Sequence, residues 1–183
     1  VLSTARSFGQ MVQYLSMTKD LRSGALGVDA GAANTTVAAA FNGQLNSTVR
    51  SDIGSAFGGA RLLQEVGHDA VARWLPFELD DGELEAFVIN KELRPLSIPS
   101  DSHELLLEQA LAREAIRATL KVARPGWVRS SGSRGDYLPP MEQIVGSGAV
   151  LTRASRPGQA ALMLLDAVEP IGVTQLLLDV YGL

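Results

Sequence analysis

Apolar and β-branched residues in the first third of the chain predict three consecutive antiparallel strands. An apolar run at residues 26–28 leads into small residues around Gly31, and β-branched residues resume at residues 35–37. This pattern is typical of two strands joined by a tight hairpin. Asn42-Gly43 is a strong turn dipeptide, so we expect a third strand at residues 44–50.

Helical spacing of apolar residues dominates the sequence on both sides of these strands. Residues 1–21 have the spacing of an amphipathic helix. After a glycine-rich stretch at residues 51–59, further helices are predicted at residues 60–66, 69–75, 81–91 and 101–124. Asp101 and Glu104 have the spacing of a capping box, which predicts the start of the last and longest of these helices.

The long predicted helix carries a basic stripe beside its apolar one. The basic residues are Arg113, Arg117, Lys121 and Arg124. A stripe of this kind is most often a solvated face. Glu114 precedes Arg117 by three residues, and this face could instead hold the ribose or phosphates of a nucleotide. The pattern leaves both interpretations open.

The last third of the chain predicts a loop and then a strand, a helix and a strand. Residues 125–140 are rich in Gly, Ser and Arg and predict a mobile loop. A buried strand that runs into a glycine turn is predicted within residues 143–151, a helix at 157–168 and a second buried strand at 174–179. This order predicts a right-handed parallel crossover. We therefore expect an α/β fold whose mixed sheet contains all five strands.

Composition limits the classes of function. The 183 residues, of which 46% are hydrophobic, suffice for one sizeable domain. A formal net charge of −4 argues against a nucleic-acid partner, which needs clustered Lys and Arg. The absence of Cys excludes disulfides and thiolate chemistry, and two distant His argue against a histidine metal site. No apolar run approaches the roughly 20 residues that span a bilayer, so we expect a cytoplasmic protein without a membrane partner.

The tip of the first hairpin carries residue types that suit phosphate binding. Asp29 is followed by Gly31 and then by Thr35. A turn without bulky side chains lets backbone N–H groups approach a phosphate, while a carboxylate can hold a hydrated divalent cation. An ordinary hairpin without a ligand has the same sequence, so the motif alone does not decide. The glycine-rich residues 51–59 likewise fit either an anion site at a helix N-terminus or a flexible connection.

Four further motifs follow the hairpin in a fixed order. They are Arg73-Trp-Leu-Pro-Phe77; Asn90-Lys91 with Arg94-Pro95 and Ile98-Pro99; Glu108-Gln-Ala with Ala112-Arg-Glu-Ala-Ile-Arg117; and Ile144-Val-Gly-Ser-Gly-Ala-Val-Leu151. Together they resemble the C-terminal part of the MutL proteins associated with glutamate mutase, which are unrelated to the mismatch-repair proteins of the same name. The order of elements is also similar to the second half of an actin-like ATPase. This resemblance spans nearly the whole chain.

The resemblance implies a ribonuclease H-like, actin-like ATPase lobe over residues 1–183, with an inserted helical subdomain at about residues 68–124. It implies binding of Mg-ATP or Mg-ADP and a chaperone-like role in maintaining or reactivating an adenosylcobalamin-dependent mutase. The chain opens inside a helical pattern without an initiating Met, which indicates a piece of a longer protein. We expect any ATPase activity only in that longer protein, and the resemblance assigns no catalytic residue here.

The resemblance also implies which residues form the site. The phosphate-binding residues would be Asp29, Gly31, Asn34, Thr35 and Thr36, with Asp29 also holding Mg²⁺ through water. The adenosine-binding residues would be Gly146, Ser147 and Gly148, joined by Glu114 and Arg117. The glycines at 31 and 148 are expected to let the backbone approach the ligand or to adopt a positive φ.

The sequence departs from the family pattern at two places. The hairpin of the family usually continues Thr-Thr-Asp, whereas here Asn34, Thr35 and Thr36 stand at these positions, so a second carboxylate is missing. Ala149 replaces the second of two paired glycines in the adenosine turn. Two other functions remain open, namely half of a sugar or acid kinase, and a binding module that kept the fold but lost the nucleotide.

Overall fold

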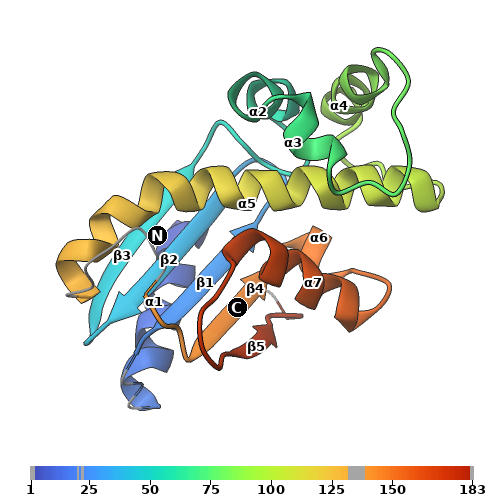
Figure 1. The fold of residues 1–183 in the computed structure, drawn as a ribbon. Helices are drawn as coiled ribbons and strands as arrows, with labels where there is room; N and C mark the ends of the chain where they lie inside the picture. The colour runs from blue at the N-terminus through green and yellow to red at the C-terminus, as the bar shows by residue number, and fades with distance from the viewer. Residues whose placement is uncertain (1–2, 20, 22, 132–138, 182–183) are drawn as a thin grey trace.

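The computed structural model describes residues 3–19, 21, 23–131 and 139–181. Its elements in chain order are α1 (Thr4–Thr18), β1 (Ala25–Ala30), β2 (Thr35–Phe41), β3 (Gln44–Arg50), α2 (Gly59–Val66), α3 (His68–Ala72), α4 (Glu83–Leu93), α5 (Ser102–Ser131), β4 (Gln143–Ser147), α6 (Ala149–Thr152), α7 (Pro157–Val168) and β5 (Gln175–Leu178) (Figure 1). The five predicted strands are all present, and α7 has the predicted bounds.

The strands form one sheet in the order β3-β2-β1-β4-β5. β2 pairs antiparallel with both β1 and β3, whereas β4 pairs parallel with both β1 and β5. The structure therefore confirms the predicted α/β class with a mixed sheet. Because β1, β4 and β5 run in the same direction, their carboxyl ends lie along one edge of the sheet.

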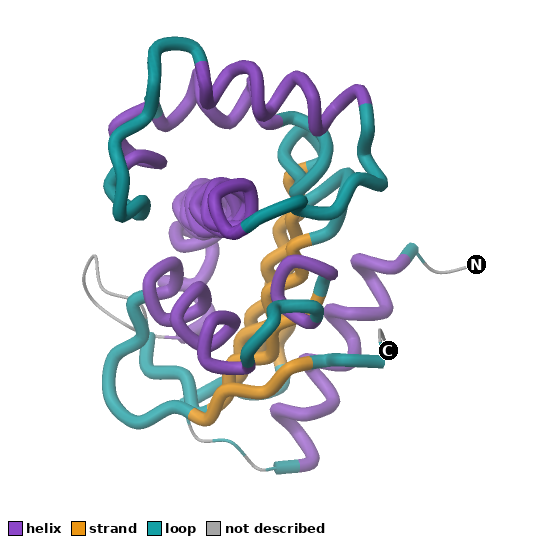
Figure 2. Tube along the Cα trace, turned by 90° about the vertical axis from the view of Figure 1, so that its right-hand side faces the viewer, coloured by secondary structure: helices purple, strands orange, loops and turns teal. Residues whose placement is uncertain are grey.

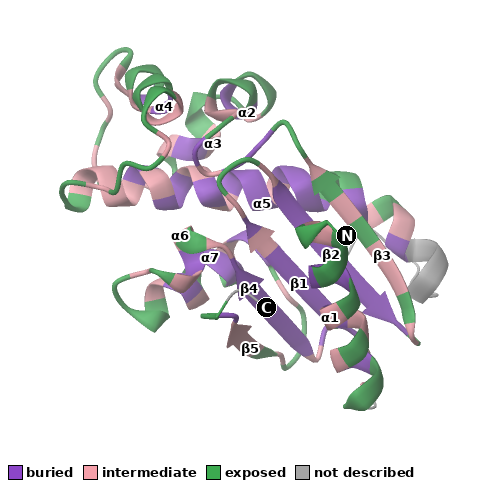
Figure 3. Ribbon diagram, turned by 180° about the vertical axis from the view of Figure 1, so that it is seen from behind, coloured by how far each residue is buried: buried purple, intermediate pink, exposed green. Residues whose placement is uncertain are grey.

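Helices cover both faces of this sheet, which Figure 2 shows nearly edge-on. α1 lies on one face, where Phe8 packs near Ala38 of β2. α5 and α7 cover the other face, where Ala39, Trp127 and Leu164 belong to one core. Every residue of β2 is buried, so this strand is covered on both faces, and after Thr35 and Thr36 its sequence is continuously apolar instead of alternating (Figure 3).

The short helices α2, α3 and α4 lie beside the amino-terminal half of α5 (Figure 1). They share a separate small core that includes Leu63, Leu84, Val88 and Leu107. Further along α5, Ile116 and Trp127 belong to the core on the sheet. The long helix thus connects the group of short helices to the sheet.

The predicted loop at residues 125–140 begins later than expected. α5 continues through Pro125 and ends at Ser131, so the prediction was wrong for residues 125–131. Proline removes one backbone hydrogen bond, but Ala123 and Trp127 are buried on either side of it, and this packing stabilises the helix across the interruption. The predicted loop at residues 132–138 lies outside the described residues.

Two smaller expectations also need correction. The predicted capping box forms only in part: the Glu104 N–H donates to Asp101 Oδ1 at 2.9 Å, but the Glu104 carboxylate accepts from the Ser100 N–H instead. β5 was predicted to be buried and is only partly so, because it lies at an edge of the sheet. Within the described ranges, no helix is both long and apolar enough to cross a membrane.

Candidate functional site

A cavity of about 300 Å³ lies at the carboxyl ends of β1, β4 and β5. Its lining includes Asp29 at the end of β1, Ser147 and Gly148 at the end of β4, and Asp179 directly after β5. Asp29 is the register partner of Ser147, and the Asp179 N–H donates to the Gly146 carbonyl oxygen at 2.9 Å. Three neighbouring strands therefore each bring one polar side chain to the same cavity.

The position of this cavity follows from the topology of the sheet. From β1 the chain adds β2 and β3 on one side and then returns to place β4 and β5 on the other side. In open α/β sheets such a reversal leaves a crevice outside the carboxyl ends of the parallel strands, and ligands bind there. Phe8 of α1 and Arg153 also line the cavity.

Two carboxylates dominate the electrostatics of the cavity. Burial raises the pKa of Asp29 above its usual value, and the neighbouring charge of Asp179 raises this pKa further. The Ser147 hydroxyl donates to Asp179 Oδ2 at 3.4 Å, which helps to place the second carboxylate. Paired carboxylates repel each other, and a divalent cation relieves this repulsion.

The donor set suits Mg²⁺ better than a metal bound entirely by the protein. Among the residues described, no group of three or more His, Cys, Asp or Glu side chains is arranged to hold a metal. Mg²⁺ usually keeps several waters and binds through one or two carboxylates together with substrate phosphates. Asp29 and Asp179 fit this pattern, and Asp179 supplies the second carboxylate that the hairpin sequence lacks.

Asp179 was missed from the sequence, although a signal for it exists. Asp29 is the last but one residue of β1, after the apolar Leu26 and Val28, and Asp179 directly follows the leucines of β5. Parallel strands bring their carboxyl ends to the same edge of the sheet. An acid at the carboxyl end of an apolar strand was therefore the pattern to search for.

The predicted phosphate-binding hairpin is covered by a neighbouring loop. The Ser55 N–H donates to the Gly31 carbonyl oxygen at 2.9 Å, and the Ala56 N–H donates to that of Ala32 at 2.9 Å. Thr35 and Thr36 are buried, and their hydroxyls have no hydrogen-bond partner among the described residues. Asn34 lies at the tip, just before β2.

The glycine turn after β4 is required by packing. Gly148 has φ +90°, and a Cβ there would lie 2.2 Å from the Ala30 carbonyl oxygen of β1. A Cβ at Gly146 would lie 2.9 Å from Leu164 of α7. Gly31 does not have a positive φ, although a Cβ there would lie 3.0 Å from the Asn34 carbonyl oxygen. These glycines therefore allow segments of this chain to pack closely against one another, and this packing alone explains the absence of a side chain at each position.

The glycine-rich loop before α2 already has an anionic partner within the chain. The Gly58 N–H, at the N-cap of α2, donates to Glu92 Oε1 at 3.0 Å. Gly58 has φ +82°, and a Cβ there would lie 2.0 Å from the Asp52 carbonyl oxygen. The carboxylate of α4 thus occupies the position where an external anion was considered.

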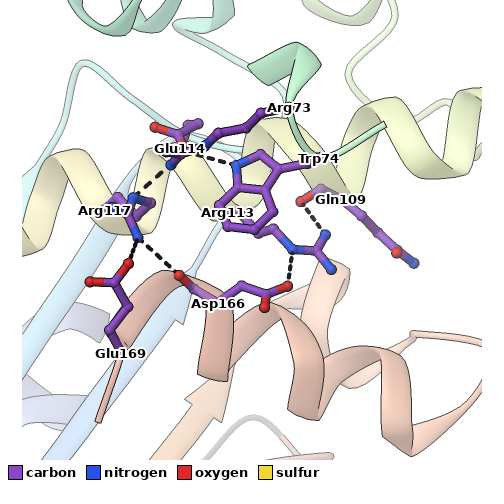
Figure 4. Close-up of polar contacts among 8 residues, drawn as sticks. All are labelled: Arg73, Trp74, Gln109, Arg113, Glu114, Arg117, Asp166 and Glu169. Carbon is purple, nitrogen blue, oxygen red and sulfur yellow. Dashed lines mark hydrogen bonds and ion pairs between the residues drawn. The ribbon is translucent and has the colours of Figure 1, made fainter. Parts of the chain in front are cut away.

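Glu114 and Arg117 form a polar network between α3, α5 and α7 (Figure 4). Glu114 is buried and accepts hydrogen bonds from Arg73 Nη2 at 2.6 Å and Trp74 Nε1 at 2.8 Å. Arg117 Nη1 donates to the Asp166 carbonyl oxygen at 3.0 Å and to Glu169 Oε1 at 2.6 Å. Neither residue is among the described residues that line the cavity at the strand ends.

The other basic residues of the stripe do not all face solvent. Arg113 donates to Asp166 Oδ2 at 2.8 Å and lies over the ring of Trp74, 5.5 Å from its centroid. Arg124 Nη2 donates to the Val168 carbonyl oxygen of α7 at 3.5 Å, whereas Lys121 is exposed. The three arginines therefore connect α5 to α7, and only Lys121 fits the interpretation of a solvated face.

Among solved structures, component A of (R)-2-hydroxyglutaryl-CoA dehydratase from Acidaminococcus fermentans is similar, with 13% sequence identity and a TM-score of 0.44. The match covers 99% of this chain and 64% of that one, so the chain spans less than two thirds of the length of that protein. No curated protein matches the chain. The model of the MutL protein family matches residues 1–182. The chain therefore belongs to the MutL protein family.

Proposed function

We propose that this chain is a nucleotide-binding lobe that holds Mg-ATP or Mg-ADP at the carboxyl ends of β1, β4 and β5. The observation that carries the proposal is the pair of carboxylates, Asp29 and Asp179, in a cavity of about 300 Å³ at the reversal point of the sheet. A cation relieves the repulsion between two such carboxylates, and a hydrated Mg²⁺ with a phosphate chain would supply one.

Each residue of the proposed site has a distinct task. Asp29 and Asp179 would hold Mg²⁺ through its water molecules, and bound Mg²⁺ would neutralise charge on the phosphates. The hairpin tip, with Gly31, would present backbone N–H groups beside Asp29. Asn34, Thr35 and Thr36 complete the proposed phosphate site, but none of them is among the described lining residues of the cavity. The buried Thr35 and Thr36 would reach a phosphate only after the loop at residues 55–56 moves away from the hairpin. The turn Gly146-Ser147-Gly148 would contact the adenosine.

Glu114 and Arg117 have a positioning role in this proposal. Their hydrogen bonds join α5 to α3 and α7, and α7 follows the glycine turn at the end of β4. They would therefore orient the elements that border the adenosine side of the site. Direct contact of either side chain with the nucleotide would require release of part of the network in Figure 4.

The biological role in this proposal is maintenance of an adenosylcobalamin-dependent mutase by a chaperone-like, nucleotide-dependent action. Membership of the MutL family and the motifs between residues 73 and 151 support it. We expect the full-length protein to co-purify with a cobalamin-dependent mutase. We also expect Mg-ATP to change the strength of this association, by weakening or by strengthening it. A full-length protein that binds nucleotide but never associates with such an enzyme would contradict this role alone.

Calorimetric titration of the full-length protein with Mg-ATP and Mg-ADP tests the nucleotide site. Asp29→Ala and Asp179→Ala should each weaken binding at least tenfold when Mg²⁺ is present and much less when EDTA replaces it, because both act through the cation. Asp81→Asn, a substitution in the exposed loop before α4, is the matched control. Equal affinities for wild type and both alanine variants would end the nucleotide proposal.

The stability of Asp29→Asn, titrated in the same way, shows whether a failed titration reflects a lost site or a lost fold. Asp29 is a half-buried carboxyl whose pKa is raised by burial and then by the charge of Asp179, so at pH 7 its ionised form is less favourable in the folded than in the unfolded chain. We expect Asp29→Asn to raise the unfolding temperature at pH 7 without nucleotide. Loss of binding together with this gain would locate the defect in the site.

A further inference from the structure

Arg153 places a positive charge beside the two carboxylates of the cavity at the strand ends. It directly follows α6 and lines the same cavity as Asp29 and Asp179. Arg153 is exposed and forms no ion pair with another described residue. The nucleotide site as proposed above makes no use of this charge.

The backbone that carries Arg153 is fixed to the turn after β4. The Arg153 N–H donates to the Ala149 carbonyl oxygen at 2.9 Å, and the Thr152 hydroxyl donates to the Gly148 carbonyl oxygen at 3.0 Å. Gly148 in turn packs so closely against Ala30 of β1 that a Cβ there would lie 2.2 Å from the Ala30 carbonyl oxygen. The main chain at residue 153 is therefore placed by the sheet, which holds this cation beside the cavity.

The carboxylates of the cavity leave the phosphates of a nucleotide in need of a further positive group. Asp29 and Asp179 offset the charge of a bound Mg²⁺, so this cation cannot also neutralise the whole phosphate chain. Arg153 is the one Lys or Arg among the described lining residues, and the exposed Arg156 is not one of them. The planar guanidinium of arginine donates two parallel hydrogen bonds to phosphate oxygens.

We propose, on the basis of the nucleotide site described above, that Arg153 binds the phosphate chain and makes this site prefer the triphosphate to the diphosphate. The carboxylates take the hydrated cation, and the guanidinium takes phosphate oxygens. Mg-ATP carries more negative charge than Mg-ADP, and adenosine carries none. The contribution of Arg153 to binding therefore follows the charge of the ligand, in the order Mg-ATP, Mg-ADP, adenosine.

Calorimetric titration of the full-length protein with Mg-ATP, Mg-ADP and adenosine tests this role. Arg153→Gln should weaken Mg-ATP binding by about tenfold, Mg-ADP binding by a smaller factor and adenosine binding not measurably. Its unfolding temperature should be unchanged, since the side chain is exposed. Arg153→Lys should restore part of the affinity for Mg-ATP, because lysine keeps the charge but not the two parallel hydrogen bonds.

Arg156→Gln is the matched control, because it removes the same charge from an exposed arginine three residues away that is outside the described lining. It should bind all three ligands like wild type. If wild type binds Mg-ATP and Arg153→Gln binds it equally well, the role of Arg153 is overturned and the nucleotide site stands. An equal loss for all three ligands would also overturn this role, since the change would then have altered the cavity as a whole. A wild type that binds no ligand would contradict the nucleotide site and this role together.

Discussion

Gly148 determines at the scale of one residue how closely the turn after β4 packs against β1. Its φ of +90° favours glycine, and a Cβ would lie 2.2 Å from the Ala30 carbonyl oxygen, a backbone atom with little freedom to move. Any nucleotide that contacts this turn therefore meets a backbone already fixed by the sheet. The fold therefore requires glycine at position 148. A substitution there is expected to lower the stability of the protein whether or not the turn binds a ligand.

We expect Gly148→Ala to lower the free energy of unfolding by about 2–4 kcal/mol, because strain in the backbone adds to the clash with β1. Gly158→Ala is the control: Gly158 lies in the first turn of α7 with open space around it, and the change should stay within about 1 kcal/mol. Urea unfolding of the two variants gives both values. Similar values for the two would show that the turn adapts to a side chain.

At the scale of elements, Arg50 ties the end of β3 to the start of the helical group. Its guanidinium donates to Asp52 Oδ1 at 2.8 Å and to Glu65 Oε2 of α2 at 2.8 Å. The hydrogen bond from Arg50 is the main cause that lowers the pKa of Asp52 from 3.8 to about 2. At a pH above 3.8, the pKa of Asp52 in the unfolded chain, this hydrogen bond contributes its full stabilisation of the fold. The contribution is lost as the pH falls from 3.8 towards 2.

The expected consequence is a loss of stability on acidification that depends on Asp52. Because the Asp52 side chain is 46% exposed, we expect its share to be below about 1 kcal/mol. Unfolding by urea, followed between pH 5 and pH 2, should show a shallower decline for Asp52→Asn than for wild type. Asp81→Asn, which removes an exposed acid without a described ion pair, should follow the wild-type curve. Parallel curves for all three proteins would contradict the assignment.

Elements with a strong local signal could be predicted from the sequence, and contacts between distant segments could not. The hairpin turn at Asn42-Gly43 and the first-turn proline of α7 fix their neighbours locally, so β2, β3 and α7 were found close to their true bounds. At Pro125 the local signal misled the prediction. Proline tends to end a helix, but α5 continues because the burial of Trp127 against the sheet outweighs that tendency. The sequence signals that Asp29 and Asp179 each lie at the carboxyl end of an apolar strand, but that both carboxylates reach one cavity depends on the order of the strands in the sheet, which single segments do not encode.

At the scale of the whole molecule, the charges of the cavity suit binding better than phosphoryl transfer. Two carboxylates line it, and Arg153 is the one Lys or Arg among its described lining residues. Phosphoryl transfer depends on positioning and on stabilisation of the charge that spreads over the transferred group. Mg²⁺ offsets part of that charge, but the lining offers few further positive groups. The further positive groups that phosphoryl transfer needs are not among the described residues that line the cavity.

We therefore expect purified residues 1–183 to show no ATP turnover above the rate in buffer, even at saturating Mg²⁺. Release of inorganic phosphate, measured beside the full-length protein at equal concentration, tests this expectation. Far-ultraviolet circular dichroism and the unfolding transition must first show that the isolated residues are folded. Turnover by this chain that Asp29→Asn abolishes would refute the expectation, because one lobe would then supply a complete catalytic site. Turnover that survives Asp29→Asn would point to a contaminating ATPase, since the substitution removes one of the two carboxylates proposed to hold the metal.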